Sequence, residues 1–215
     1  MTRIIICAGG PVEELCDLLS YVNKETVVIG ADRGALYCLA QGITPAIMIG
    51  DFDSVTAEEW QQLQQTNAEI ERYPAEKDDT DTNLALQRAL ALLPTEVIVT
   101  GVTGGRLDHY EAVLRKIYEL QQQYPHIQWQ IAGKHNVVRF LLPGTTTLAR
   151  EAFAYVSFFA YGGDVQNVTI RGLKYETTNE PMPLTCGLFT SNEFIAATAT
   201  VSFEENMIMM IMSED

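Results

Sequence analysis

Two aspartates, Asp51 and Asp53, follow a short apolar segment that ends in Gly50. Apolar segments of this length that end in glycine are typical of buried parallel strands, and ligands bind in the crevice beyond the carboxyl ends of such strands. Carboxylate oxygens are the ligands that Mg²⁺ prefers, and Mg²⁺ usually binds together with the phosphates of a substrate. The pattern therefore indicates a magnesium and phosphate site, and an Asp-rich turn without a ligand accounts for it equally well.

Three further aspartates crowd together in residues 76–83, EKDDTDTN, directly before a segment rich in alanine and leucine that is typical of a helix. Acidic residues at the start of a helix complement its dipole, which accounts for part of this charge. It does not account for Asp78, Asp79 and Asp81 together, because like charges this close repel one another unless a cation binds among them. This segment also favours a cation site.

A third polar cluster is the sequence VTGGRLDH, residues 102–109. Its paired glycines let the backbone approach a ligand closely, and Arg106 offers a planar set of donors that suits phosphate. Asp108 and His109 stand near the start of the next predicted helix. A packing or capping role explains His109 as well as a catalytic one does.

The elements that must position these side chains alternate between apolar strands and helices. Strands are predicted at residues 3–8, 26–31, 46–49, 69–73 and 96–101, and helices at residues 12–19, 35–41, 56–63, 84–93 and 110–123. This alternation predicts an α/β domain, a mostly parallel sheet with flanking helices as in Rossmann-like folds. Such a sheet gathers the carboxyl ends of its strands along one edge. We therefore expect convergence of the aspartates that stand where a strand gives way to a turn or a helix: Asp32, Asp51, Asp53, Asp81 and Asp108.

The pattern changes after a predicted strand at residues 127–132, and helical spacing disappears. Short alternating segments follow at residues 137–142, 145–148, 154–160, 165–172 and 194–203, with a methionine-rich last strand at residues 207–212. Glycine- and proline-containing turns separate them, and residues 179–183 are predicted to be a loop. This alternation of short strands and turns predicts an antiparallel β-sandwich. We therefore expect two domains, residues 1–134 and residues 135–215.

Composition restricts the classes of partner. The formal net charge of -14 and the sequence pI of about 4.5 make a nucleic-acid surface improbable and favour a cationic small molecule. The apolar segments are far shorter than the roughly 20 residues of a membrane-spanning helix, and the first of them is too short for a signal peptide. The four cysteines show no metal-ligand spacing, which favours reduced thiols in a cytoplasmic protein.

The motifs together resemble those of the bacterial thiamine pyrophosphokinases. The resemblance runs from about Ile29 to Phe194 through ADRGALYCLAQGITPAIMIGDFDSV, EKDDTDTNLAL and GVTGGRLDH, followed by RGLKYE and TSNEF. It implies an α/β nucleotide-binding catalytic domain, a C-terminal β-sandwich that binds thiamine, and a homodimer. It also implies the activity of an ATP-dependent thiamine diphosphokinase, in which Mg²⁺ assists transfer of the pyrophosphoryl group of ATP to the thiamine hydroxyl and AMP is released.

Matching these motifs residue by residue implies a set of site residues. The resemblance assigns Mg²⁺ binding to Asp51, Asp53 and Asp81, and completes the catalytic set with Arg106 and Asp108. It places the ATP contacts on Asp32, Lys77, Asp78 and His109, and on Arg106, which also belongs to the catalytic set. It places the thiamine contacts at the dimer interface, on Ser191, Asn192 and Glu193. Arg106 and Lys77 would stabilise charge on the transferred group while the thiamine hydroxyl attacks the β-phosphorus in line. Asp108 and Asp32 are both candidates for the base that receives the hydroxyl proton.

Two positions depart from the family pattern. Arg33 stands in a turn where that pattern often has glycine, so its side chain either contacts phosphate or points into solvent. The eukaryotic members stack thiamine on a tryptophan of the β domain, whereas Trp60 and Trp129 both lie before residue 135. The sequence therefore does not identify the aromatic residue that stacks on thiamine.

Two alternative functions stay open at this point. The segment Asp51–Val55 also satisfies the DxDx[TV] pattern of haloacid-dehalogenase-like phosphatases, in which the first aspartate is a nucleophile. That motif usually follows the first strand of its domain, whereas two predicted strand–helix units precede Asp51. The other alternative is a catalytically inactive module that binds thiamine or a nucleotide.

Overall fold

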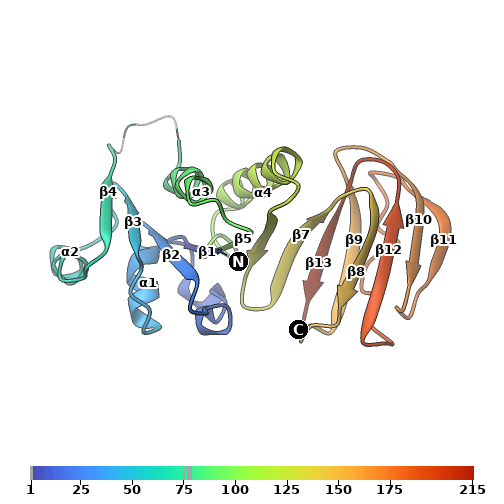
Figure 1. Cartoon of the computed structure of the whole chain (residues 1–215), viewed down its shortest axis with the longest axis horizontal. Helices are drawn as coiled ribbons and strands as arrows, with labels where there is room; N and C mark the ends of the chain where they lie inside the picture. The colour runs from blue at the N-terminus through green and yellow to red at the C-terminus, as the bar shows by residue number, and fades with distance from the viewer. Residues whose placement is uncertain (1, 75, 77–78) are drawn as a thin grey trace. The chain divides into compact units, whose positions relative to one another are not determined.

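The sheet of the first part of the chain has the strand order β4-β3-β2-β1-β5-β6, and its neighbouring strands are parallel. The computed structural model describes residues 2–74, 76 and 79–215, and the chain divides into two compact units between Lys134 and His135 (Figure 1). The strands of the first unit are β1 (Arg3–Cys7), β2 (Thr26–Ala31), β3 (Ile47–Gly50), β4 (Glu69–Arg72), β5 (Glu96–Thr100) and β6 (Gln128–Ala132).

The central strand shows why this sheet is parallel and covered on both faces. Ile4, Ile5 and Ile6 of β1 follow one another in sequence, so they point to alternate faces, and all three are fully buried. Continuous apolar strands of this kind require helices on both faces of the sheet. These helices are α1 (Gly34–Ala40), α2 (Ala57–Gln64), α3 (Asp81–Ala91) and α4 (Leu107–Gln123). In Figure 1, α3 and α4 lie on one side of the sheet and α1 lies on the other.

The helix predicted at residues 12–19 is wrong. The chain instead forms two short 3₁₀ turns, η1 (Val12–Glu14) and η2 (Leu18–Ser20). Tertiary partners replace the helical hydrogen bonds between them: Cys16 N–H donates to Thr100 Oγ1 at 3.3 Å, and Leu18 N–H donates to Gln41 Oε1 at 2.9 Å. The apolar periodicity that suggested a helix comes from the burial of both Leu15 and Leu18.

The second unit contains two antiparallel sheets. One has the order β7-β13-β9 and the other the order β11-β10-β12-β8. The strands are β7 (Asn136–Leu141), β8 (Gly144–Ala149), β9 (Tyr155–Tyr161), β10 (Val165–Arg171), β11 (Thr177–Met182), β12 (Thr198–Phe203) and β13 (Met207–Ser213). Buried residues alternate along β12 and β13, as in strands with one face on a core. The predicted α/β sheet followed by an antiparallel β fold is confirmed.

Two details of the second unit differ from the prediction. Residues 177–182 form β11, although residues 179–183 were expected to be a loop because of Pro181. Within the described sheet β11 pairs with β10 alone, and an edge strand tolerates a proline because it needs fewer donors. Conversely, a strand was predicted at residues 194–203, but β12 begins only at Thr198, so residues 194–197 are not part of it.

No helix within the described residues is long and apolar enough to cross a membrane.

Candidate active site

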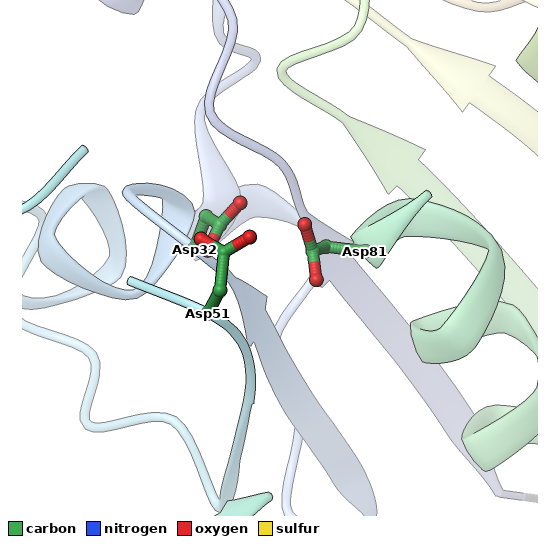
Figure 2. Close-up of side chains that lie close together, drawn as sticks. All are labelled: Asp32, Asp51 and Asp81. Atoms are coloured by element: carbon green, nitrogen blue, oxygen red, sulfur yellow. The ribbon is translucent and has the colours of Figure 1, made fainter. Parts of the chain in front are cut away.

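Three carboxylates converge beyond the carboxyl ends of β2 and β3. Each of Asp32, Asp51 and Asp81 offers an oxygen atom, and these atoms all lie within 4.8 Å of one another. Figure 2 shows the three side chains pointing toward a common centre, with Asp32 after β2, Asp51 after β3 and Asp81 at the first turn of α3. Since all three are partly buried, the structure concentrates negative charge where water is only partly available to screen it.

Asp32 is held by a turn that depends on the adjacent strand. Its backbone has a positive φ of 48°, its N–H donates to the Ile49 carbonyl at 2.9 Å, and its Oδ1 accepts the Phe52 N–H at 3.1 Å. Gly50 makes room for this carboxylate, because a Cβ at that position would lie 2.2 Å from Asp32 Oδ1. The glycine that marks the end of β3 in the sequence is therefore part of the site.

Asp51 is set by the packing of the residue that follows it. Phe52 has a φ of 59°, is buried, and packs its ring against Trp60 of α2 with centroids 4.8 Å apart. Asp51 Oδ1 accepts the Asp53 N–H at 3.0 Å, so the two residues form an Asx turn. Asp53, to which the resemblance assigned Mg²⁺, is exposed and lies outside the three-carboxylate cluster, whereas Asp32, to which the resemblance assigned an ATP contact, lies within it.

Asp81 owes its place to the cap of α3. Thr80 Oγ1 accepts the Asn83 N–H at 3.2 Å, and Asp81 is the first helical residue. The positive end of the helix dipole stabilises a carboxylate there. The helix therefore begins three residues earlier than the predicted residue 84.

The cluster changes the acidity of Asp32. Burial, together with the hydrogen bond to Asp81 and the negative charge of that residue, raises the pKa of this carboxyl from 3.8 to about 7, although the Phe52 N–H acts to lower it. A carboxyl in this environment retains a proton near neutral pH unless a cation replaces that proton.

Mg²⁺ is expected to compete with this proton. Because the pKa of Asp32 is raised to about 7 in the folded chain, the metal-free folded chain keeps a proton on Asp32 between about pH 4 and pH 7, whereas the unfolded chain has lost it. The contribution of Asp32 to the free energy of unfolding therefore decreases as the pH rises from about 4 to about 7. Because Mg²⁺ needs the deprotonated carboxylate, the increase in Tm caused by Mg²⁺ should be larger at about pH 8 than at about pH 6.

Thermal unfolding with and without Mg²⁺ at both pH values measures this competition. The matched control is Asp32→Asn, which keeps the side-chain oxygen that accepts the Phe52 N–H but does not titrate. The variant should lose most of the pH dependence of the Mg²⁺-induced change in Tm. The same pH dependence in wild type and variant would assign the competing proton to another group.

Arg106 and Asp108 form a second charged feature, at the start of α4. Arg106 donates to both carboxylate oxygens of Asp108, from Nε at 3.1 Å and from Nη2 at 2.6 Å. This pairing lowers the pKa of Asp108 to about 2 and raises the pKa of Arg106. Asp108 is therefore a poor proton acceptor at neutral pH while Arg106 is bound to it. Both side chains are about two-thirds exposed, which leaves the guanidinium accessible to an anion.

The loop before α4 is shaped by its glycines. Gly104 has a φ of 77°, and a Cβ on it would lie 2.3 Å from the side chain of Glu14. The turn therefore packs closely on the segment after β1. His109 lies exposed in the first turn of α4, and its proposed contact with ATP stays a prediction. Lys77 and Asp78 lie outside the described residues.

The three residues predicted to bind thiamine lie together in the second unit but have different partners. Asn192 is buried; its Oδ1 accepts the Tyr175 N–H at 2.9 Å and its Nδ2 donates to the Tyr175 carbonyl at 2.8 Å. Glu193 accepts a hydrogen bond from Lys174 Nζ at 2.6 Å. Ser191 is exposed and has a φ of 56°. Asn192 therefore positions Tyr175, and Glu193 is neutralised by Lys174.

A hollow of about 280 Å³ opens beside these residues. Its lining residues are Tyr175, Thr177, Glu180, Pro181, Leu188, Phe189, Thr190 and Asn192. Tyr175 is 59% exposed, which is unusual for a large aromatic side chain. The sequence did not single out this tyrosine, although its aromatic character within RGLKYE was the signal available.

Comparisons with known proteins agree with this arrangement. The family model for the thiamin pyrophosphokinase catalytic domain matches residues 18–129, and the model for the thiamin pyrophosphokinase vitamin B1 binding domain matches residues 145–208. The thiamine pyrophosphokinase of Bacillus subtilis is 35% identical over 216 residues, which cover 100% of both chains.

Solved structures are similar over the whole chain. A crystal structure of thiamine pyrophosphokinase from Bacillus subtilis superposes with a TM-score of 0.93 at 34% identity and covers 100% of both chains. A thiamin pyrophosphokinase from Geobacillus thermodenitrificans superposes with a TM-score of 0.87 at 37% identity, covering 100% of this chain and 98% of that one. Similarity at this level extends through both units.

Proposed function

Since the chain belongs to the thiamin pyrophosphokinase family, we propose that Asp32, Asp51 and Asp81 hold a Mg²⁺ ion on the phosphates of ATP. The chain is an ATP-dependent enzyme that converts thiamine into thiamine diphosphate. The observation that carries the proposal is the convergence of three carboxylates from three separate elements of the sheet edge (Figure 2).

The donor set fits magnesium. All three groups present carboxylate oxygens, which Mg²⁺ prefers, and the cluster offers neither the sulfur nor the imidazole ligands typical of zinc. The raised pKa of Asp32 shows that ionising this carboxyl beside Asp81 is unfavourable in the absence of a cation. When bound, Mg²⁺ neutralises phosphate charge and supports the in-line transfer of the pyrophosphoryl group.

Arg106 supplies the mobile positive charge in this proposal. Without substrate its guanidinium is bound to Asp108, and both side chains are exposed, so exchange of the carboxylate for a phosphate needs no rearrangement of the core. The planar guanidinium binds two phosphate oxygens as it binds the two oxygens of Asp108. The pairing keeps Asp108 ionised and orients Arg106 before ATP binds. For Asp53, Lys77, Asp78 and His109 the proposed role toward ATP and its metal rests on the motif match alone.

The second unit is proposed to bind thiamine through Tyr175 together with Ser191 and Asn192. Thiamine carries a cationic thiazolium ring and an aromatic pyrimidine, and both bind favourably over the face of an aromatic side chain. Tyr175 is the exposed aromatic residue beside the hollow, and Asn192 fixes its backbone on both sides. The match of residues 145–208 to the vitamin B1 binding domain supports this placement.

Replacing Tyr175 by alanine is expected to raise the KM for thiamine about tenfold, because it removes the stacking surface. The backbone N–H and carbonyl that bind Asn192 remain, so the local fold should persist. Tyr175→Phe keeps the ring and should behave nearly as wild type, and the KM for ATP should be unchanged in both variants. A wild-type KM for thiamine in Tyr175→Ala would contradict the stacking role.

We also propose a homodimer, with the β unit as the dimerisation domain. Leu184, Leu188 and Ile195 of this unit are each more than half exposed, and such apolar side chains favour burial against another chain. Gel filtration of the full chain tests this proposal, and a monomer at assay concentration would contradict it.

The experiment that tests the function as a whole is AMP release from ATP and Mg²⁺, with and without thiamine. AMP that appears only with thiamine establishes pyrophosphoryl transfer. Release of inorganic phosphate with a covalent aspartyl-phosphate at Asp51 would instead favour the phosphatase alternative. Thiamine binding without any turnover would favour the inactive module.

A further inference from the structure

Arg33 joins the two chain segments that carry Asp32 and Asp51. Its Nη1 donates to the Ser54 carbonyl at 2.6 Å and its Nη2 donates to Glu59 Oε1 at 2.7 Å. Arg33 directly follows Asp32 in sequence, and Ser54 lies three residues after Asp51. The sequence suggested either a phosphate contact or a solvent-exposed side chain. In this structure the half-buried guanidinium instead binds the loop that follows β3.

Glu59 connects this contact to α2. Its Oε2 accepts the Thr56 N–H at 2.9 Å, and Thr56 Oγ1 accepts the Glu59 N–H at 3.2 Å, which together form a capping box. One carboxylate therefore binds Arg33 and also fixes the first turn of the helix. The end of the loop is therefore tied both to the first turn of α2 and, through Arg33, to the Asp32 turn.

The loop needs an anchor because its metal-binding residue is repelled by its neighbours. The carboxyl groups of Asp32, Asp51 and Asp81 lie close together, and whenever more than one of them is ionised, the like charges favour movement of Asp51 away from the cluster. Phe52 holds the middle of the loop through its buried ring and through its N–H bond to Asp32. Arg33 holds the far end, beyond Asp53, where the chain is otherwise exposed.

We propose that Arg33 is a positioning residue that clamps residues 51–54 to the Asp32 turn and so keeps Asp51 where the metal ion needs it. This inference rests on the metal site proposed above and adds a residue that lies outside the carboxylate cluster. It concerns the free chain, because the contacts of Arg33 are formed before any substrate binds.

The sign of the effect separates positioning from simple electrostatics. Arg33 carries a positive charge near the cluster. If this charge were its only influence, removing Arg33 would strengthen the binding of a cation. Loss of the clamp would instead weaken binding, since an outer contact that orients a metal ligand typically contributes about 10- to 100-fold in affinity. A weaker metal affinity in Arg33→Ala is therefore evidence for the clamp.

The chain offers a matched control in Arg3. This arginine also binds one carboxylate, Glu96, at 2.6 Å and one backbone carbonyl, that of Tyr21, at 2.6 Å. Its side chain is 28% exposed, compared with 35% for Arg33. Arg3 lies at the amino end of β1, at the opposite edge of the sheet from the cluster. Arg3→Ala therefore removes a similar set of contacts away from the metal site.

The experiment measures Mn²⁺ binding to the full chain without nucleotide, from the electron paramagnetic resonance signal of free Mn²⁺, together with the Tm of each variant. Arg33→Ala should weaken Mn²⁺ binding about tenfold. Arg33→Lys should bind Mn²⁺ more tightly than Arg33→Ala but more weakly than wild type. Its ammonium group keeps the positive charge, but it can bind only one of the two acceptors of Arg33, the Ser54 carbonyl and the Glu59 carboxylate, with good geometry. Arg3→Ala should leave Mn²⁺ binding unchanged while lowering the Tm by a similar amount.

Unchanged or tighter Mn²⁺ binding in Arg33→Ala would overturn the clamp, and so would an equal loss of affinity in Arg3→Ala. Asp51→Asn in the same assay separates failure of the clamp from failure of the metal site. If that variant binds Mn²⁺ as wild type does, the metal site itself is wrong and the clamp is overturned with it.

Discussion

Replacing Asp51 by asparagine is expected to lower thiamine-dependent AMP formation about a thousandfold, with the chain still folded. Asparagine has the shape of aspartate but lacks the negative charge that the proposed Mg²⁺ site requires. Metal-based charge stabilisation contributes several kcal/mol to transfer reactions of this kind, and a thousandfold loss corresponds to about 4 kcal/mol. The loss should appear in kcat as well as in the Mg²⁺ requirement, because the charge on the phosphates grows during transfer.

The fold should survive because the substitution removes repulsion. Asp51 is one of three clustered carboxyl groups and is repelled by any of the others that is ionised, and an asparagine at this position would keep the oxygen that accepts the Asp53 N–H. The Tm without metal should therefore be unchanged or higher. Asp17 offers a matched control, since its Oδ1 also accepts the N–H two residues later, at 3.1 Å, but it precedes η2 and lies outside the cluster. Asp17→Asn should keep wild-type activity.

Retained activity in Asp51→Asn would contradict the metal role. The Tm of the variant shows whether a loss of activity comes from unfolding instead. Asp53→Asn adds a second comparison, because the motif match assigns Asp53 to the metal while the described structure leaves it exposed. A loss at Asp53 as large as that at Asp51 would extend the ligand set. A small loss would limit it to the three clustered carboxylates.

Arg106→Ala is expected to produce the second largest loss, about a hundredfold or more in kcat. A guanidinium that binds the transferred group stabilises charge that develops during the reaction, and the loss of such a group costs at least this much in related transfers. Arg106→Lys should recover only part of the activity, because a lysine cannot bind two oxygens in one plane. Stability should change little, since the pair with Asp108 is exposed.

Arg115 is the matched control for Arg106. It lies on α4, the helix that Arg106 directly precedes, is 72% exposed, and also pairs with a carboxylate, since its Nε and Nη2 both contact Oε1 of Glu111 at 2.8 Å. Arg115→Ala should keep wild-type kcat and KM. Equal losses in Arg106→Ala and Arg115→Ala would show that the effect comes from helix α4 as a whole rather than from a contact of Arg106 with the transferred group.

The sheet could be predicted from the sequence because its strands carry their own signal. Ile4, Ile5 and Ile6 form a continuous apolar run, and Gly50 marks the end of β3. The segment after β1 could not be predicted, because Cys16 and Leu18 bind tertiary partners that are distant in sequence. Local periodicity contains no information about those partners.

The carboxylate cluster shows a similar division. That Asp51 and Asp81 stand at one edge of the sheet follows from the order of strands and helices. The same order predicts that Asp32 stands there too. That the cluster contains Asp32 but leaves out Asp53 and Asp108 does not follow from that order, because it depends on the parallel pairing of β2 with β3 and on the space left by Gly50. The role proposed for Tyr175 could not be predicted for a different reason. RGLKYE offers an aromatic residue, but nothing in that sequence tells whether its side chain is exposed, because exposure is set by the neighbouring strands.

The most direct measurement is anomalous diffraction from crystals grown with Mn²⁺ and a non-hydrolysable ATP analogue. A Mn²⁺ peak bound by oxygens of Asp32, Asp51 and Asp81 and by the phosphates is the result we expect. A metal peak that lies away from these three carboxylates, or is bound by Asp53 and Asp108 without Asp32, would contradict the proposed site.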